Sequence, residues 1–233
     1  MRGVTAQTFA SLFDRGGSLL IDGISFDQCL FENCAFSLTK RLAKRSTVRN
    51  CEFKECTVSG CDIGPAIVEQ VSISDLSTND LLIVWGAVFN KVKFSGNIGK
   101  LKINQAVHHV DRSRETQGQF DDFRVSFYAS VDWALDIREA RFKEFDVRGI
   151  PAAKFLRDPE SQVVITRERA MRGEWRQGIS RGNTLWPFMI KLFLADGDRD
   201  TVLVAPLGAS RAKRAQLLAG LNELRSLGVA EPD

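Results

Sequence analysis

Apolar side chains recur along this chain with a spacing of five residues, each unit pairing one small and one larger residue. The clearest stretch, CEFKE CTVSG CDIGP, begins at Cys51, and in each unit an apolar residue follows the cysteine two positions later. An α-helix repeats every ~3.6 residues and a strand every ~2 residues, so neither produces a period of five. The period instead predicts a β-rich chain that turns a corner once in every five residues.

This five-residue spacing of apolar residues, which we call the grid, extends over about half of the sequence. It runs from about residue 24 to residue 103, with a lapse inside 37–47. A second array repeats the spacing over residues 135–147. Two separate arrays indicate a repeated structural unit rather than a chance spacing.

The pattern resembles the pentapeptide-repeat family, whose units carry a small residue, often Asp or Asn, then Leu or Phe, and then two freer positions. The resemblance covers roughly residues 24–103 and 125–155, and an Asp between the small and the large residue is present at Asp62, Asp136 and Asp146. It implies a right-handed quadrilateral β-helix, in which four units make one turn and the small and large residues point inward. The expected fold class is therefore mainly β: a right-handed, pentapeptide-repeat-like β-helix solenoid with an N-terminal capping helix and a C-terminal α/β element.

In such a fold the cysteines mark positions that stack on one another. Cys29 and Cys51 are 22 residues apart, as are Cys34 and Cys56. One turn of about twenty residues plus a two-residue insertion within 37–47 then predicts Cys29 over Cys51 and Cys34 over Cys56. A packing role is favoured over a redox or metal site, because cysteine is among the most buried residue types and no CxxC occurs.

Three regions follow from where the grid begins and ends. Residues 1–20 are expected to form an N-terminal cap, a short amphipathic helix that covers the open end of the β-helix. The apolar face of that helix would carry Phe9, Leu12 and Phe13. Residues 21–157 are expected to form the β-helix itself, with a loop insertion near 105–124.

Residues 158–233 have a different character and are expected to form the C-terminal α/β element. Within it, 161–166 and 201–205 read as strands because they are rich in β-branched residues. Ser210 reads as the N-cap of a final amphipathic helix that ends near Gly228.

Charge and composition narrow the possible partners. Lys and Arg number 32 against 29 Asp and Glu, a formal net charge of +3. This balance makes nucleic acid an unlikely partner and argues against a strongly acidic mimic of DNA. The apolar runs are too short to span a bilayer and no secretory signal is evident, so no membrane association and a cytoplasmic location are expected. An odd number of cysteines, five, suits a reducing compartment.

Candidate binding residues lie where the grid breaks. Residues 37–49 carry five basic residues and no acid, and the segment near 105–124 holds both histidines of the chain. Such breaks could be solvated loops, or they could contact an acidic protein surface. The candidate partner-binding residues are Lys40, Arg41, Lys44, Arg45, His108 and His109.

No arrangement in the sequence indicates catalysis, a metal or a cofactor. Asp196, Asp198 and Asp200 imitate the start of a calcium loop, but Thr201 and Leu207 occupy its glycine and acidic positions. No GxSxG, HExxH or phosphate-loop signature occurs. We therefore expect no catalytic residues, no metal and no cofactor.

The favoured function is a non-enzymatic bacterial scaffold that binds a protein, such as a toxin or an enzyme, as an immunity-type or partner-neutralising protein does. One alternative is a topoisomerase-protecting pentapeptide protein, although those work as acidic rods and this chain carries a net positive charge. Another alternative is an enzyme with its site in the C-terminal element. The oligomeric state is left open.

Overall fold

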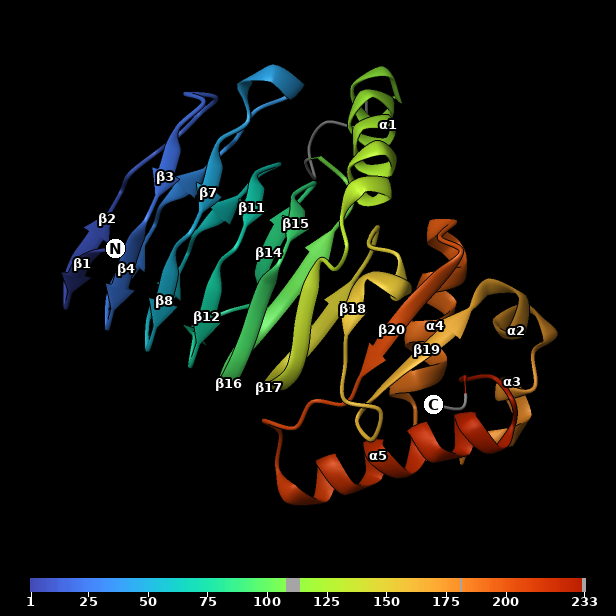
Figure 1. Ribbon diagram of the computed structural model, residues 1–233. Helices are drawn as coiled ribbons and strands as arrows, with labels where there is room; N and C mark the ends of the chain where they lie inside the picture. Colours follow the sequence, from blue (N-terminus) through green and yellow to red (C-terminus); the bar gives the residue numbers. More distant parts are fainter. Residues whose placement is uncertain (108–113, 181, 232–233) are drawn as a thin grey trace.

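The computed structural model describes residues 1–107, 114–180 and 182–231 of the chain (Figure 1). Short parallel strands in three sheets make up its N-terminal part, and a fourth sheet is a single antiparallel pair. Neighbours in a sheet are distant in the sequence: Phe26 pairs with Phe53, and Phe53 pairs with Ile73.

The largest sheet has ten strands in the order β1-β4-β8-β12-β16-β14-β10-β6, with β17 paired to β16 and β18 paired to β17. Its strands are β1 (Arg2–Thr5), β4 (Ile24–Asp27), β6 (Ala35–Phe36), β8 (Glu52–Lys54), β10 (Asp62–Ile63), β12 (Ser72–Ser74), β14 (Leu82–Trp85), β16 (Val92–Asn104), β17 (Leu135–Val147) and β18 (Phe155–Leu156).

Two smaller parallel sheets have four strands each. One has the order β13-β9-β5-β2 and the other the order β15-β11-β7-β3. The strands of the first are β2 (Thr8–Ala10), β5 (Leu30–Glu32), β9 (Thr57–Ser59) and β13 (Ser77–Thr78). The strands of the second are β3 (Leu20–Asp22), β7 (Thr47–Arg49), β11 (Ile67–Glu69) and β15 (Val88–Asn90).

Tight corners separate the short strands. Asn33 (φ 50°) and Asn50 (φ 52°) adopt the left-handed conformation that Asn tolerates better than most residues, and Gly60 (φ 60°) does so without a steric cost. Between the corners, the apolar residues of the grid line the space between the three parallel sheets and form the main core. The local sequence thus supplies both the turns and the buried faces.

The predicted fold class is wrong. The parallel strands do not form one closed four-sided coil, because ten of them belong to a single sheet that β16 holds together. β16 is 13 residues long; it pairs with β12 through Lys93–Ser95 and with β14 through Leu101–Asn104. The five-residue pattern predicted separate short strands here, not one strand of 13 residues.

The five-residue pattern also changes after Phe94. The five-residue spacing requires an apolar residue at position 99, and Gly99 stands there, packed so close to Thr78 that a Cβ would clash with it. Gly96 takes the same left-handed conformation (φ 69°) as the corner residues, but β16 is paired on both sides of it, with β12 before it and with β14 after it. β17 keeps the five-residue period and pairs with β16 from Val92↔Leu135 to Ile103↔Val147, with a register shift between Lys93 and Ser95.

The predicted N-terminal capping helix is also wrong. Residues 1–20 contain β1 and β2 and the start of β3, which pair with β4, β5 and β7 respectively. Phe9 therefore belongs to a strand, and its ring stacks on that of Phe31 with ring centres 5.1 Å apart. The prediction had placed Phe9 on a helix that covers the end of the parallel strands. Pairing satisfies the backbone groups of β4 and β5 that would otherwise form an exposed edge.

The predicted stacking of the cysteines is wrong by five residues. Ala35 and Phe36 pair with Asp62 and Ile63, an offset of 27 residues rather than 22. As a result Cys29 lies beside Cys56, and the Cys34 amide donates to the Cys61 thiol at 3.4 Å. The insertion within 37–47 is longer than expected because it includes a 3₁₀ turn, η1 (Leu42–Lys44).

The expected loop near 105–124 is in part a helix. The helices of the protein are α1 (Arg114–Ser130), α2 (Arg167–Arg172), α3 (Trp175–Gly178), α4 (Leu185–Asp196) and α5 (Arg211–Ser226), and a second 3₁₀ turn is η2 (Ala152–Lys154). Across the described ranges, no helix is both long and apolar enough to cross a membrane.

A second core lies in the C-terminal part. Its strands β19 (Gln162–Thr166) and β20 (Asp200–Val204) form the antiparallel pair, at the positions where strands were expected. Trp175, Trp186 and Leu221 are fully buried between this pair and the helices. Ser210 caps α5, since its side chain accepts a hydrogen bond from the Lys213 amide.

Candidate partner-binding surface

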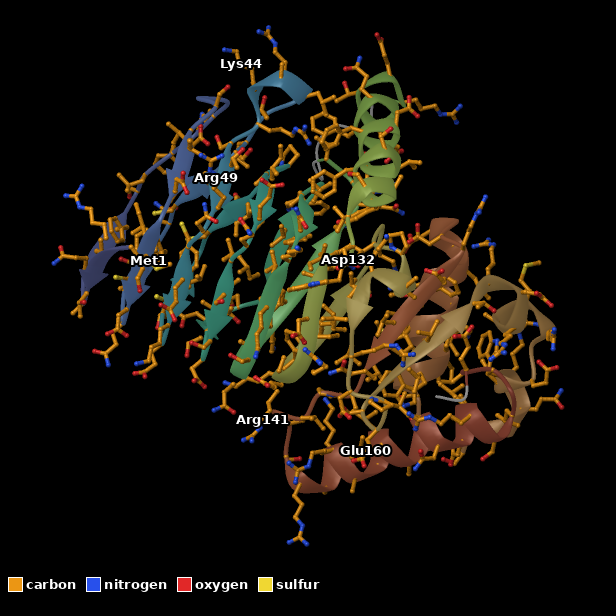
Figure 2. All side chains as sticks on the ribbon, in the orientation of Figure 1. Met1, Lys44, Arg49, Asp132, Arg141 and Glu160 are labelled. Atoms are coloured by element: carbon orange, nitrogen blue, oxygen red, sulfur yellow. The ribbon has the colours of Figure 1, made fainter. Side chains whose placement is uncertain are left out.

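The basic segment 37–46 forms an ordered loop at one end of the short strands. Lys40, Arg41 and Lys44 are exposed, whereas Arg45 is half-buried. Figure 2 shows Lys44 at the outer end of this loop, on the side of the molecule where α1 stands. The two candidate histidines, His108 and His109, lie outside the described residues.

A buried polar network fixes the base of the loop. One carboxylate oxygen of Asp14 accepts hydrogen bonds from the Ser37 amide (2.9 Å) and the Ser46 hydroxyl (2.5 Å), and the other accepts from the Gly17 amide (2.8 Å). The Ser37 hydroxyl in turn accepts from the Ser46 amide at 2.9 Å. Satisfied networks of this kind rigidify a structure because breaking any member leaves a buried polar group unpaired.

Arg45 joins the loop to α1. Its guanidinium lies 3.8 Å from the centre of the Phe123 ring and 5.8 Å from that of Phe120. Its Nε also donates to the Leu42 carbonyl at 2.9 Å. Burial lowers the pKa of Arg45 to about 10, which leaves it a cation at neutral pH, and the aromatic faces favour that charge. Arg45 therefore serves the packing of the loop more than the exposed surface.

α1 is in turn anchored to the parallel sheets. The Tyr128 hydroxyl accepts a hydrogen bond from the Phe89 amide at 3.3 Å, and the side chain is fully buried. This burial raises the pKa of Tyr128 well above its ordinary value, so the hydroxyl stays neutral. The two places where the five-residue grid breaks thus meet on one side of the molecule (Figure 1).

A fourth exposed cation comes from the N-terminal segment. Gly16 packs against the loop, since a Cβ added to it would lie 3.2 Å from the Thr39 hydroxyl and 3.7 Å from Lys44 Cβ. Its neighbour Arg15 is exposed. We name the four residues the basic surface: Arg15, Lys40, Arg41 and Lys44. Sequence reasoning missed Arg15 because residues 1–20 were expected to be a cap, although Gly16 and Gly17 signal a turn there.

The cysteines do not have the environment of reactive thiols. All five are free, and Cys29, Cys51 and Cys56 are buried. Desolvation raises the pKa of Cys56 and of Cys61, whereas nucleophilic cysteines have a lowered pKa. Within the described residues, no group of three or more His, Cys, Asp or Glu side chains is placed to hold a metal ion.

The aspartates that imitate a calcium loop connect the C-terminal part to the parallel strands. Asp196 pairs with buried Arg148 at 2.7 Å, and Asp198 accepts from the Gly149 amide at 3.2 Å. Asp200 accepts from the Ala152 amide at 2.8 Å. Burial raises the pKa of Asp198. These contacts give the carboxylates a structural role.

Comparisons with known proteins do not assign the chain to a family. A scan against models of protein families finds no match, and a search of curated protein sequences finds no significant match. The resemblance to the pentapeptide-repeat family therefore stays a prediction based on the sequence.

Proposed function

We propose that this protein is a non-enzymatic scaffold that binds an acidic surface of another protein through the basic surface. The observation that carries the proposal is the meeting of the loop 37–46 with α1. Four exposed cations come together there from two neighbouring turns, and packed side chains hold those turns in place.

The anchoring of the loop supports binding. Ordering a mobile loop on association costs free energy, and a loop already fixed by Asp14 and Arg45 avoids most of that cost. The exposed cations would speed the encounter with an acidic partner and orient it. The expected partner surface is therefore rich in Asp and Glu.

A protein partner fits this surface better than a nucleic acid does. Nucleic-acid binders typically neutralise about 6–10 phosphates. The basic surface supplies only four cations, and the formal net charge of the whole chain is +3.

Within this proposal, the favoured role is that of an immunity-type protein that neutralises a toxin or escorts an enzyme in the cytoplasm. Such a role requires a stable complex and no turnover.

The experiment compares two charge-reversed variants as baits in a pull-down from the native host. The first is Lys40→Glu, Arg41→Glu and Lys44→Glu in one chain. The matched control is Arg211→Glu, Lys213→Glu and Arg214→Glu, which changes the net charge equally at exposed positions of the first turn of α5. Glutamates at a helix N-terminus are favourable, so the control should fold normally.

We expect the wild type and the control to retain one acidic partner, and the first variant to bind it at least tenfold more weakly in titrations with the purified partner. Raising the salt concentration should weaken the wild-type complex as well, because exposed charges are screened. Equal retention by both variants, or equal loss, would refute the basic surface as the binding site.

A further inference from the structure

The space between the three parallel sheets is incompletely filled. It holds a cavity of about 620 Å³, within the ~300–1,000 Å³ range of small-molecule sites. Six residues that line it are only partly buried although they point away from the outer surface: Phe31, Phe53, Val58, Ile63, Val68 and Ile73. Only two of its lining residues are ionisable carboxylic acids, Asp14 and Asp62.

The sequence explains why the interior is hollow. In the first layers the rings of Phe26 and Phe53 stack with centres 5.0 Å apart, and both rings line the cavity. In the next layers the positions facing the interior carry shorter, β-branched residues such as Val58 and Val68. These side chains reach less far inward and leave the centre open.

The cavity opens at the end of the stack formed by β1, β2 and β3. Each of these strands pairs with one neighbour only, among the residues that the structure describes. Leu12, Phe13 and Leu19 line the cavity at this end and are 56%, 52% and 47% exposed. The mouth is therefore an apolar rim in contact with solvent.

The side chain of Arg15 places a positive charge at the rim. The Arg15 guanidinium lies 5.6 Å from the centre of the Phe13 ring. The Asp14 carboxylate, which also lines the cavity, already accepts three hydrogen bonds from its own loops. Asp14 is buried and Arg15 is exposed, so Arg15 is the charged group at this rim that a ligand can reach.

We propose that the cavity binds the hydrocarbon chain of a single-chain anionic amphiphile, a long-chain fatty acid, with its carboxylate near Arg15. Apolar cavities do not stabilise water and take up apolar ligands instead. Lining residues extend from β2 to β16, and the five strands β1, β4, β8, β12 and β16 give a depth of about 19 Å at ~4.8 Å per strand. An apolar cavity of this volume and depth can hold an acyl chain, and the cation at the rim matches its head group.

A second copy of the chain fits the cavity less well. An end-to-end contact would cover Leu12, Phe13 and Leu19, but it would not reach lining residues far inside, such as Val84 and Phe94. The fatty-acid proposal goes beyond the proposed partner binding and does not depend on it.

The test measures binding of palmitate to the full chain by isothermal titration calorimetry. Val58→Phe fills the cavity, and Val125→Phe is the matched control, because Val125 is 70% exposed on α1. We expect saturable binding to the wild type and to the control, and at least tenfold weaker binding to Val58→Phe. Arg15→Glu should weaken palmitate binding severalfold and leave the binding of hexadecanol, which has no charge, unchanged.

Circular dichroism and thermal unfolding report whether each variant folds. If Val58→Phe unfolds, Ile73→Phe replaces it as the cavity-filling variant. Absence of saturable palmitate binding to the wild type, or equal binding by the cavity-filling variant, would overturn the proposal. A wild-type dimer that Phe13→Ser converts to a monomer, with no palmitate bound by either form, would show instead that a second copy covers the mouth.

Discussion

The guanidinium of Arg45 lies 3.8 Å from the centre of the Phe123 ring, although the two residues are separated by more than seventy positions in the sequence. This contact links the basic loop to α1, and both segments interrupt the repeat of the parallel strands. The surface proposed to bind a partner therefore depends on one cation that is itself only half-exposed.

The first prediction concerns the energy of this contact. A double-mutant cycle with Arg45→Met and Phe123→Leu should give a coupling free energy of about 0.5–2 kcal/mol in urea unfolding, because a partly desolvated cation on an aromatic face is stabilising. The control cycle uses Arg15 and Phe13, whose ring is half-exposed. Its coupling should be smaller, and equal couplings would contradict a special role for Arg45.

The second prediction concerns Asp14. Asp14→Asn turns an acceptor of three hydrogen bonds into a group with one acceptor oxygen and a donor, so a buried amide or hydroxyl loses its partner. The free energy of unfolding should fall by about 1–3 kcal/mol. Limited proteolysis within 37–46 should become faster, because the base of the loop is no longer fixed.

Asp22→Asn is the matched control for this change. Asp22 is exposed, and its hydrogen bonds to Arg49 hold its pKa below the ordinary value. Since solvent screens this pair, the control should lose much less stability and keep the loop resistant to protease. Similar behaviour of the two variants would argue against the buried network as the anchor of the loop.

The third prediction concerns the pH dependence of stability. Burial raises the pKa of Cys56 and Cys61 above 9.0, the ordinary value of a thiol. Above that pH the thiols ionise in the unfolded chain but stay protonated in the folded one, so the unfolded state binds fewer protons. Stability should therefore decline as the pH rises from 9 toward the raised pKa values.

Urea titrations at pH 8 and pH 10 on the wild type and on Cys56→Ala/Cys61→Ala check this prediction. The double variant should lose less stability between the two pH values than the wild type does. Tyr128 contributes in the same direction in both proteins, because burial raises its pKa too. An equal decline in both would mean that the two thiols are not responsible.

Part of the candidate site could be predicted from the sequence. The basic loop was identified by its charge, and Lys40, Arg41 and Lys44 are exposed as a binding role requires. Arg45 was grouped with them on the same ground, but its aromatic partners lie in a segment that was expected to be a loop. The contribution of Arg15 could not be predicted, because it depends on Gly16 packing against Thr39.

The sequence by itself determined which side chains face the interior along the strands, because alternation and small corner residues act over a few neighbours. Cys56, Val71 and Ile103, all on the five-residue grid, are buried. Only the tertiary structure decided which strands pair, since register depends on the length of the insertions between them. It set the 27-residue offset of Cys34 and Cys61, joined ten strands in one sheet through β16, and left a cavity between the parallel sheets.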